Sequence, residues 1–100
     1  MNSLVINSDT DFLFKAILSL ENEEECYRFF EDLCTSPELK AMSQRLVVAK
    51  MLTEKKVYSE IVKETGASTA TISRVKRALF DNATYGYTLV LDKIAKEENK

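Results

Sequence analysis

The chain has 100 residues, the size of one small domain with a limited core. It contains two Gly and one Pro, 45% of its residues are hydrophobic and helix-forming residues dominate, so we predict an all-α fold with a single domain over residues 1–100. The formal net charge is −2, no apolar run could span a bilayer and the N-terminus lacks a basic segment followed by an apolar one, so we expect a soluble cytoplasmic protein without membrane contact.

Two short helices are predicted within residues 10–35. Thr10 or Asp11 can begin the first helix, and Asn22 with Glu25 three residues later is a capping-box pattern that begins the second. Their apolar side chains lie on more than one side, so we expect a second subunit to cover these dimerisation helices. Folding back onto their own chain is the alternative. The apolar residues are Phe12, Leu13, Ala16, Ile17, Leu20, Cys26, Phe29, Phe30, Leu33 and Cys34.

A longer third helix is predicted from Ser36 to Glu54. Ser36 suits the cap, Pro37 is tolerated at the first helical position, and Glu38 suits the positive end of the helix dipole. The two lysines that follow the helix suit its negative end. The predicted buried stripe consists of Leu39, Met42, Leu46, Ala49 and Leu52.

Residues 58–79 have the pattern of a helix-turn-helix. The first helix covers residues 58–64, and Gly66 ends it because a left-handed turn conformation costs glycine little. Ser68 then caps a second helix by accepting a backbone N–H that would otherwise lack a partner. The apolar stripe of that helix is Ile72, Val75 and Leu79, at positions i, i+3 and i+7.

The opposite face of this second helix is polar and contains no acidic residue between Ser68 and Leu79. Short hydroxyls and cations at the front of a helix can contact base edges and phosphates in a major groove. A helical hairpin in an ordinary α-bundle is the alternative interpretation. The polar face consists of Thr69, Thr71, Ser73, Arg74, Lys76 and Arg77.

The charge distribution also favours nucleic-acid binding by this segment. Residues 40–81 hold nine Lys or Arg and four acidic residues, a net charge of +5, whereas the rest of the chain holds five basic and twelve acidic residues, a net charge of −7. Phosphate binding requires positive charge near the motif. Chance clustering of acids on solvated helix faces would explain the acidic remainder but not the coincidence of basic charge with the motif.

A last helix is predicted over residues 85–96, where Gly86 weakens its start. Residues 81–84 are expected to form a short connection, and residues 1–8 and 97–100 to be a tail and a frayed end. The chain thus has about six predicted helices and no predicted strand. The apolar residues of the last helix are Tyr87, Val90, Leu91 and Ile94.

The order of these helices resembles that of the tryptophan repressor family over about residues 10–95. The likeness is most specific in Gly66-Ala-Ser-Thr-Ala-Thr-Ile-Ser-Arg74 and in Ser43-Gln-Arg-Leu-Val47, and the chain is most similar to the tryptophan-repressor-like YerC/YecD group. The resemblance implies an intertwined homodimer that controls transcription, as a repressor, with the helix-turn-helix in the major groove of a double-stranded operator. The predicted DNA-binding residues are Ser68, Thr69, Ala70, Thr71, Ser73, Arg74, Lys76 and Arg77.

The resemblance also implies an effector pocket. The family's corepressor site uses two arginines that match Arg45 and Arg74, and a threonine that matches Thr35. A family glycine that lets the indole lie flat on the backbone is Val75 here, and a family serine that helps to hold the ligand's head group is Ala78. We therefore expect a small molecule other than tryptophan, if any, to occupy the candidate pocket of Thr35, Arg45, Arg74 and Val75.

The sequence offers no catalytic or metal-binding constellation. It has no His, no Cys-X-X-Cys pair and no glycine-rich phosphate loop, so we expect neither an enzyme nor a cofactor. Cys26 and Cys34 are eight residues apart, about 12 Å on one helix, and are expected to be reduced thiols. The main alternative to a DNA-binding regulator is a protein-interaction module that retains a helix-turn-helix scaffold.

Overall fold

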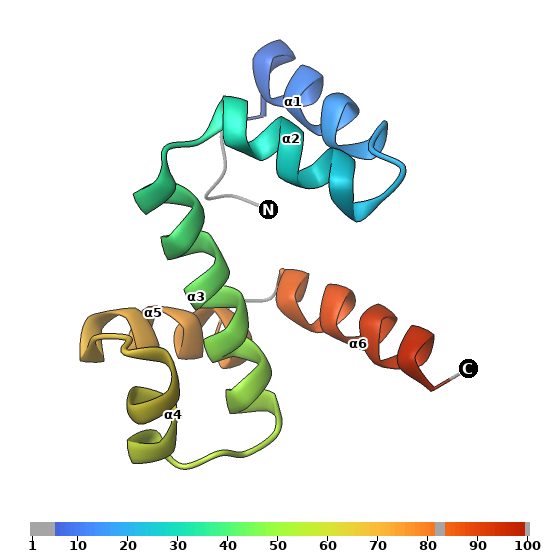
Figure 1. Ribbon diagram of the computed structural model, residues 1–100. Coiled ribbons are helices and arrows are strands. Elements are labelled where there is room, and N and C mark those ends of the chain that lie inside the picture. The colour runs from blue at the N-terminus through green and yellow to red at the C-terminus, as the bar shows by residue number, and fades with distance from the viewer. Residues whose placement is uncertain (1–5, 82–83, 100) are drawn as a thin grey trace. The chain divides into compact units, whose positions relative to one another are not determined.

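The computed structural model describes residues 6–81 and 84–99 and contains six α-helices within them (Figure 1). The described residues include no strand, so the all-α prediction is confirmed. The chain divides into two compact units, residues 1–39 and 40–100, which we describe separately. The helices are α1 (Ser8–Leu18), α2 (Glu23–Leu33), α3 (Ser36–Thr53), α4 (Tyr58–Thr65), α5 (Thr69–Phe80) and α6 (Gly86–Glu98).

The first helix begins earlier than predicted. Asn7 is its cap, and the Asn7 Oδ1 atom accepts the backbone N–H of Thr10 at 2.9 Å. Thr10 and Asp11, the predicted starting residues, therefore lie inside the first turn, because an asparagine three residues upstream already satisfies the Thr10 amide. The predicted tail is correspondingly shorter, and its residues 1–5 lie outside the described part of the chain.

The cap of α2 is the predicted residue. The Asn22 Oδ1 atom accepts the backbone N–H of Glu25 at 2.9 Å, as the capping-box pattern requires. The reciprocal bond differs from the usual box, because the Glu25 carboxylate accepts the N–H of Glu21 at 2.9 Å. The side chain thus reaches one residue further back and joins the chain that enters α2 to its first turn.

The cap of α3 is Thr35, so the prediction of Ser36 was wrong. The Thr35 Oγ1 atom accepts the Glu38 N–H at 3.2 Å, and the Thr35 N–H donates to Glu38 Oε1 at 2.8 Å. Only a cap at Thr35 places a glutamate three residues later, where the reciprocal pair can form. The Thr35 amide lowers the pKa of Glu38, and the Thr35 hydroxyl lowers it further, because both contacts favour the carboxylate.

Thr35→Ala should raise the pKa of Glu38 toward its ordinary value, because it removes the hydroxyl contact and leaves the amide contact. The stability that this contact contributes is present above the ordinary pKa of glutamate and is lost as the pH falls through the lowered pKa. A carboxyl-detected NMR titration measures the shift. Ser36→Ala is the control, and an equal rise in that variant would restore Ser36 as the cap.

Two nested backbone hydrogen bonds end α3. The Lys56 N–H donates to the Met51 carbonyl at 3.0 Å, and the Lys55 N–H donates to the Leu52 carbonyl at 3.1 Å. Lys55 has a φ of 61°, the left-handed conformation that this arrangement needs and that glycine usually supplies. The helix ends at Thr53, one residue before the predicted Glu54.

The core of the second unit joins α3, α4 and α5. It differs from the predicted stripe of α3, since Ala49 is buried whereas Met42 and Leu46 are exposed. Apolar residues occupy several sides of α3, so their spacing did not indicate which side the neighbouring helices cover. The buried residues are Val48, Ala49, Met51, Ile61, Ala67, Ile72, Val75 and Leu79.

The last helix, α6, lies against this core through Tyr87 and Leu91. It begins one residue later and ends two residues later than predicted, and Tyr85 precedes it in a left-handed conformation with a φ of 54°. The predicted frayed end is helical through Glu98, and Lys100 lies outside the described residues. Within the predicted connection 81–84, residues 82 and 83 also lie outside them.

An open groove of about 520 Å³ runs between α3 and α6. Apolar side chains from both helices line it, among them Leu46, Val47, Leu91 and Ile94. Within residues 6–81 and 84–99, none of the helices combines the length and apolar character needed to cross a bilayer.

Candidate nucleic-acid interface

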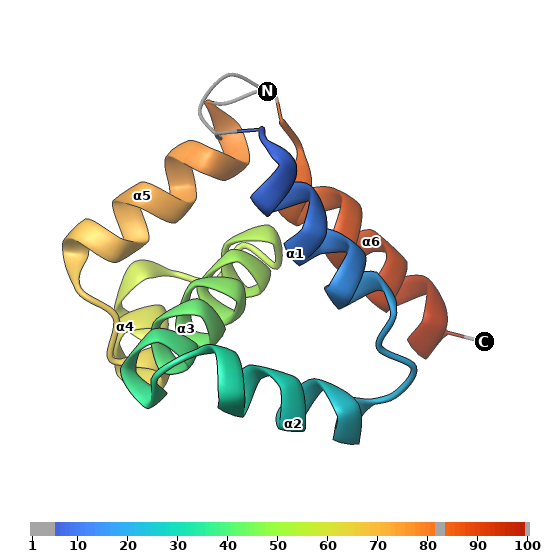
Figure 2. The same ribbon diagram turned by 90° about the horizontal axis from the view of Figure 1, so that it is seen from above.

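The turn between α4 and α5 is built around Gly66. Its φ is 69°, and its N–H donates to the Val62 carbonyl at 2.8 Å, which ends α4 as predicted. A Cβ atom at this position would meet no other atom within 4 Å, so the backbone conformation and not the available space favours glycine. This turn sets the direction in which α5 leaves α4, and α5 runs across the direction of α4 in Figure 1, while Figure 2 shows α5 from above.

Thr65 holds the turn from both sides. Its hydroxyl donates to the Ile61 carbonyl at 2.7 Å and accepts the Ala67 N–H at 3.1 Å. The Thr65 carbonyl, at the end of α4, accepts the side-chain amide of Gln44 at 3.0 Å. A residue of α3 therefore satisfies a helix-end carbonyl of α4, which links the turn to the longest helix of this unit.

The start of α5 has the predicted cap. The Ser68 Oγ atom accepts the Thr71 N–H at 3.1 Å and lies 3.1 Å from Thr71 Oγ1, to which its hydroxyl donates. No acidic residue lies in the first turn of α5. The first turn of α5 therefore forms the positive end of the helix dipole, with no carboxylate of its own to neutralise it.

The two faces of α5 differ as the sequence pattern indicated. Ile72, Val75 and Leu79 are buried in the core, and Val75 is only 1% exposed. Of the predicted DNA-binding residues, Thr71 and Ser73 are half-buried and the others are exposed to solvent, namely Ser68, Thr69, Ala70, Arg74, Lys76 and Arg77. One side of the helix therefore holds it in the fold and leaves the polar side open to a ligand.

One contact of this surface was not predicted from the sequence. The Tyr58 Oη atom, at the start of α4, lies 2.7 Å from Thr69 Oγ1, at the start of α5. The two residues are eleven positions apart, so helix periodicity gives no sign of their contact. Only the crossing of α4 and α5 at the turn brings them together.

The residues of the candidate effector pocket lie in both units. Thr35 belongs to residues 1–39, where its hydroxyl and amide cap α3, whereas Arg45, Arg74 and Val75 belong to residues 40–100. Arg45 is half-buried on α3 and Arg74 is exposed on α5. Ala78 lines a separate shallow hollow of about 290 Å³ with Thr84, Gly86 and Tyr87.

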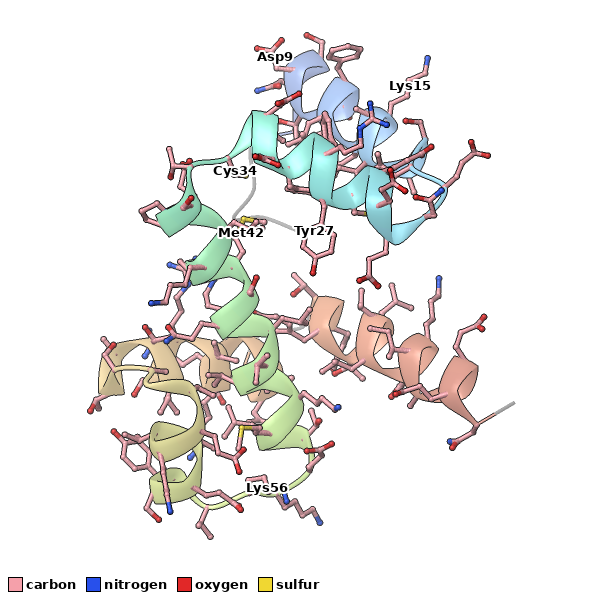
Figure 3. All side chains as sticks on the ribbon, in the orientation of Figure 1. Asp9, Lys15, Tyr27, Cys34, Met42 and Lys56 are labelled. Atoms are coloured by element: carbon pink, nitrogen blue, oxygen red, sulfur yellow. The ribbon has the colours of Figure 1, made fainter. Side chains whose placement is uncertain are left out.

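Cations also extend from the segment that precedes the helix-turn-helix. Lys55 and Lys56 follow α3 and are exposed, and the Lys56 side chain extends away from the ribbon in Figure 3. Lys63 is exposed on α4. The second unit therefore carries exposed positive charge on α4 and beside α3 as well as on α5.

Comparison with known proteins identifies the family to which this arrangement belongs. The family described as Trp repressor protein matches residues 8–95. The chain is 53% identical over 95 residues to YerC, an uncharacterised Bacillus subtilis protein, and the match covers 92% of this chain and 88% of YerC.

Two solved structures share the fold. A candidate Trp repressor from Staphylococcus aureus is 53% identical, with a TM-score of 0.86 over 90% of this chain and 89% of its own. A TrpR-like protein from Eubacterium eligens is 48% identical, with a TM-score of 0.85 over 89% of this chain and 91% of its own. The family match over residues 8–95 extends from α1 into α6 and is not confined to the helix-turn-helix. The chain therefore belongs to the Trp repressor family and, within it, to the TrpR-like YerC group.

Proposed function

We propose that this protein is a sequence-specific regulator of transcription, acting as a repressor, that places α5 in the major groove of double-stranded DNA. The observation that carries the proposal is the contrast between the two sides of α5. Its apolar side is buried, while its exposed side combines hydroxyls and cations without an acid. Membership of the Trp repressor family supports the same function.

The residues of this surface would have different roles in a DNA complex. Arg74, Lys76 and Arg77 supply positive charge for phosphates, which gives affinity independent of sequence. Thr69, Thr71 and Ser73 supply hydroxyls for base edges, and the methyl group of Ala70 suits the methyl group of thymine. Ser68 contributes by holding the first turn of α5, whose N–H groups attract anions.

The proposed function is tested by selecting bound duplexes from a random pool, with and without free amino acids. We expect a preferred sequence to emerge, and its affinity to fall with salt because binding releases counterions from the phosphates. A random duplex should bind more weakly at the same salt concentration. Failure to bind any duplex would favour the alternative, a protein-interaction module with a helix-turn-helix scaffold.

We expect the regulator to be an obligate homodimer. Several large apolar side chains of α1 and α2 are exposed, with Leu18 at 84% and Phe12 at 74%, and Tyr27 projects away from α2 in Figure 3. The α3–α6 groove adds a second apolar surface. A second copy that covers these surfaces would also supply two α5 helices, which need to lie about 34 Å apart to enter successive major grooves of a near-palindromic operator.

Sedimentation equilibrium tests the dimer. The expected mass is that of two chains at all micromolar concentrations, and the unfolding temperature should rise with protein concentration because association stabilises the folded state. A monomer that stays folded at micromolar concentration would exclude an obligate dimer. Leu18→Lys should weaken association, whereas Lys15→Ala on the same helix should not.

We also expect free L-tryptophan not to control DNA binding. Val75 is buried, and its isopropyl group occupies volume where the family has glycine. Overlap with an indole ring should reduce the binding free energy of tryptophan by about 1–3 kcal/mol. Ala78 lacks a hydroxyl for the ligand head group, which costs about 1–3 kcal/mol more. Together these changes lower affinity by about a hundredfold or more.

Calorimetry with millimolar tryptophan should therefore show no binding heat, and operator affinity should be the same with and without it. Micromolar affinity for tryptophan in the natural chain would contradict this expectation. The loss of such affinity in a Val75→Gly variant would contradict the steric reason as well.

A further inference from the structure

The contact between Tyr58 and Thr69 lies at the front of the proposed reading surface. Both residues are the first of their helices, α4 and α5, and their oxygen atoms are 2.7 Å apart. Tyr58 is 50% exposed and Thr69 is also exposed, so neither hydroxyl is a buried polar group that requires a partner within the protein. A bond between two exposed hydroxyls contributes little to folding, because water would satisfy both groups.

The direction of this hydrogen bond follows from chemistry. A phenolic O–H is a stronger donor than an aliphatic O–H, because the ring stabilises the negative charge that develops on its oxygen. Each hydroxyl offers one hydrogen and two acceptor lone pairs. The favoured arrangement therefore has Tyr58 donating to Thr69, which leaves the hydroxyl hydrogen of Thr69 for another partner.

Thr71, two residues after Thr69, also accepts a hydrogen bond from a hydroxyl of the protein. The Ser68 hydroxyl donates to Thr71 Oγ1 at 3.1 Å, although Thr71 is half-buried. Thr69 and Thr71 thus each accept from within the protein. Thr69 is the exposed one, so its hydroxyl hydrogen is accessible to a ligand.

We propose that Tyr58 is a positioning residue for sequence recognition, which fixes Thr69 as a hydrogen-bond donor to one base of each half-site. The proposal rests on the proposed function and adds a specificity-determining residue that lies outside α5. A donor suits the N7 and O6 atoms of guanine, the N7 atom of adenine and the O4 atom of thymine, and it is mismatched to the amino group of cytosine. The bond from Tyr58 takes one of the two lone pairs of Thr69 and polarises its O–H, so Thr69 favours a base that offers an acceptor over the amino group of cytosine.

A direct phosphate contact by Tyr58 is a simpler role, and it predicts a different effect of Tyr58→Phe on DNA affinity. The exposed Tyr58 hydroxyl could bind a phosphate directly, and its loss would then weaken binding to all sequences by the same factor. A positioning role instead changes the preference among bases at one position, and only while Thr69 keeps its hydroxyl. The two roles are separable by measuring all four bases at each operator position.

The test compares Tyr58→Phe, Thr69→Val and the double variant on the selected operator and on its single-base substitutions. We expect Tyr58→Phe to reduce discrimination against cytosine at one position of each half-site by about three- to tenfold, the worth of one hydrogen bond. In the Thr69→Val background, Tyr58→Phe should have no further effect. Tyr85→Phe, which removes a phenolic hydroxyl outside the helix-turn-helix, should leave the preferences unchanged.

Three results would overturn the proposal. The first is a Tyr58→Phe variant with the base preferences of the natural chain, and the second is a Tyr58→Phe variant that loses the same factor of affinity for every sequence. The third is a double variant in which the effects of Tyr58→Phe and Thr69→Val on base preference multiply as independent factors. Circular dichroism of each variant checks that α4 and α5 stay folded. If the natural chain binds no duplex, the proposed function fails; if it binds and Tyr58→Phe behaves as the natural chain, only the role of Tyr58 fails.

Discussion

Ile61→Ala should lower the free energy of unfolding by about 2–5 kcal/mol, the largest stability loss expected from one substitution in α4. The Ile61 side chain is 0% exposed and belongs to the core that joins α4 to α3 and α5. Its loss removes apolar contacts and leaves a cavity that the surrounding helices fill only in part. Small domains have about 5–15 kcal/mol of stability in total, so this variant should be close to unfolding.

Denaturant unfolding at a fixed protein concentration measures this change, since dimer formation would make stability depend on concentration. Val57→Ala is the control, because Val57 immediately precedes α4 but is 65% exposed, and its effect should stay within about 0.5 kcal/mol. Ile61→Val should lie between them at about 0.5–1.5 kcal/mol. Equal effects of Ile61→Ala and Val57→Ala would contradict the described core.

A double variant, Arg74→Ala with Arg77→Ala, should lose at least about a hundredfold in operator affinity at moderate salt, since a hydrogen bond to a charged group contributes about 1.5–3 kcal/mol. Both arginines are exposed on α5, so the protein should remain folded. Each phosphate contact removed makes the negative slope of log affinity against log salt shallower by about 0.9. In a two-fold dimer, each substitution removes its contact twice.

The affinity loss should be similar for all sequences, which distinguishes these arginines from residues that read bases. Thr71→Ala should instead change the preferred sequence, because it removes a hydroxyl that we propose contacts a base edge. Lys93→Ala on α6 is the matched control for loss of an exposed cation outside the helix-turn-helix. If the folded double variant binds DNA as well as the natural chain, the assignment of α5 to the DNA is wrong.

The features predicted correctly depend on neighbours in the sequence. Gly66 ends α4 and Ser68 caps α5 because a left-handed residue and a side-chain oxygen act within one turn of their own position. The buried side of α5 was also predictable, since Ile72, Val75 and Leu79 form one stripe and every other position except the exposed terminal Phe80 is polar or small. Local chemistry therefore determines most of the candidate surface.

The features predicted incorrectly depend on competition or on distant residues. Thr35 and Ser36 can both cap α3, and the choice between them depends on which one places Glu38 for the reciprocal bond. The buried side of α3 depends on where α4 and α5 lie, because apolar residues occupy several of its sides. The bond between Tyr58 and Thr69 needs the crossing of two helices, which no periodicity contains.

The bonds around Thr65 have a consequence for how such a regulator can evolve. Gln44 and the Thr65 hydroxyl fix the corner between α4 and α5 through bonds that all lie within residues 40–100. In a dimer that acts as proposed, the spacing of half-sites would be a property of the subunit interface, whereas base preference would be a property of α5 and of Tyr58 at the start of α4. Substitutions on this surface would then exchange one target sequence for another while the distance between half-sites stays constant, so selection could act on target sequence and on half-site spacing separately.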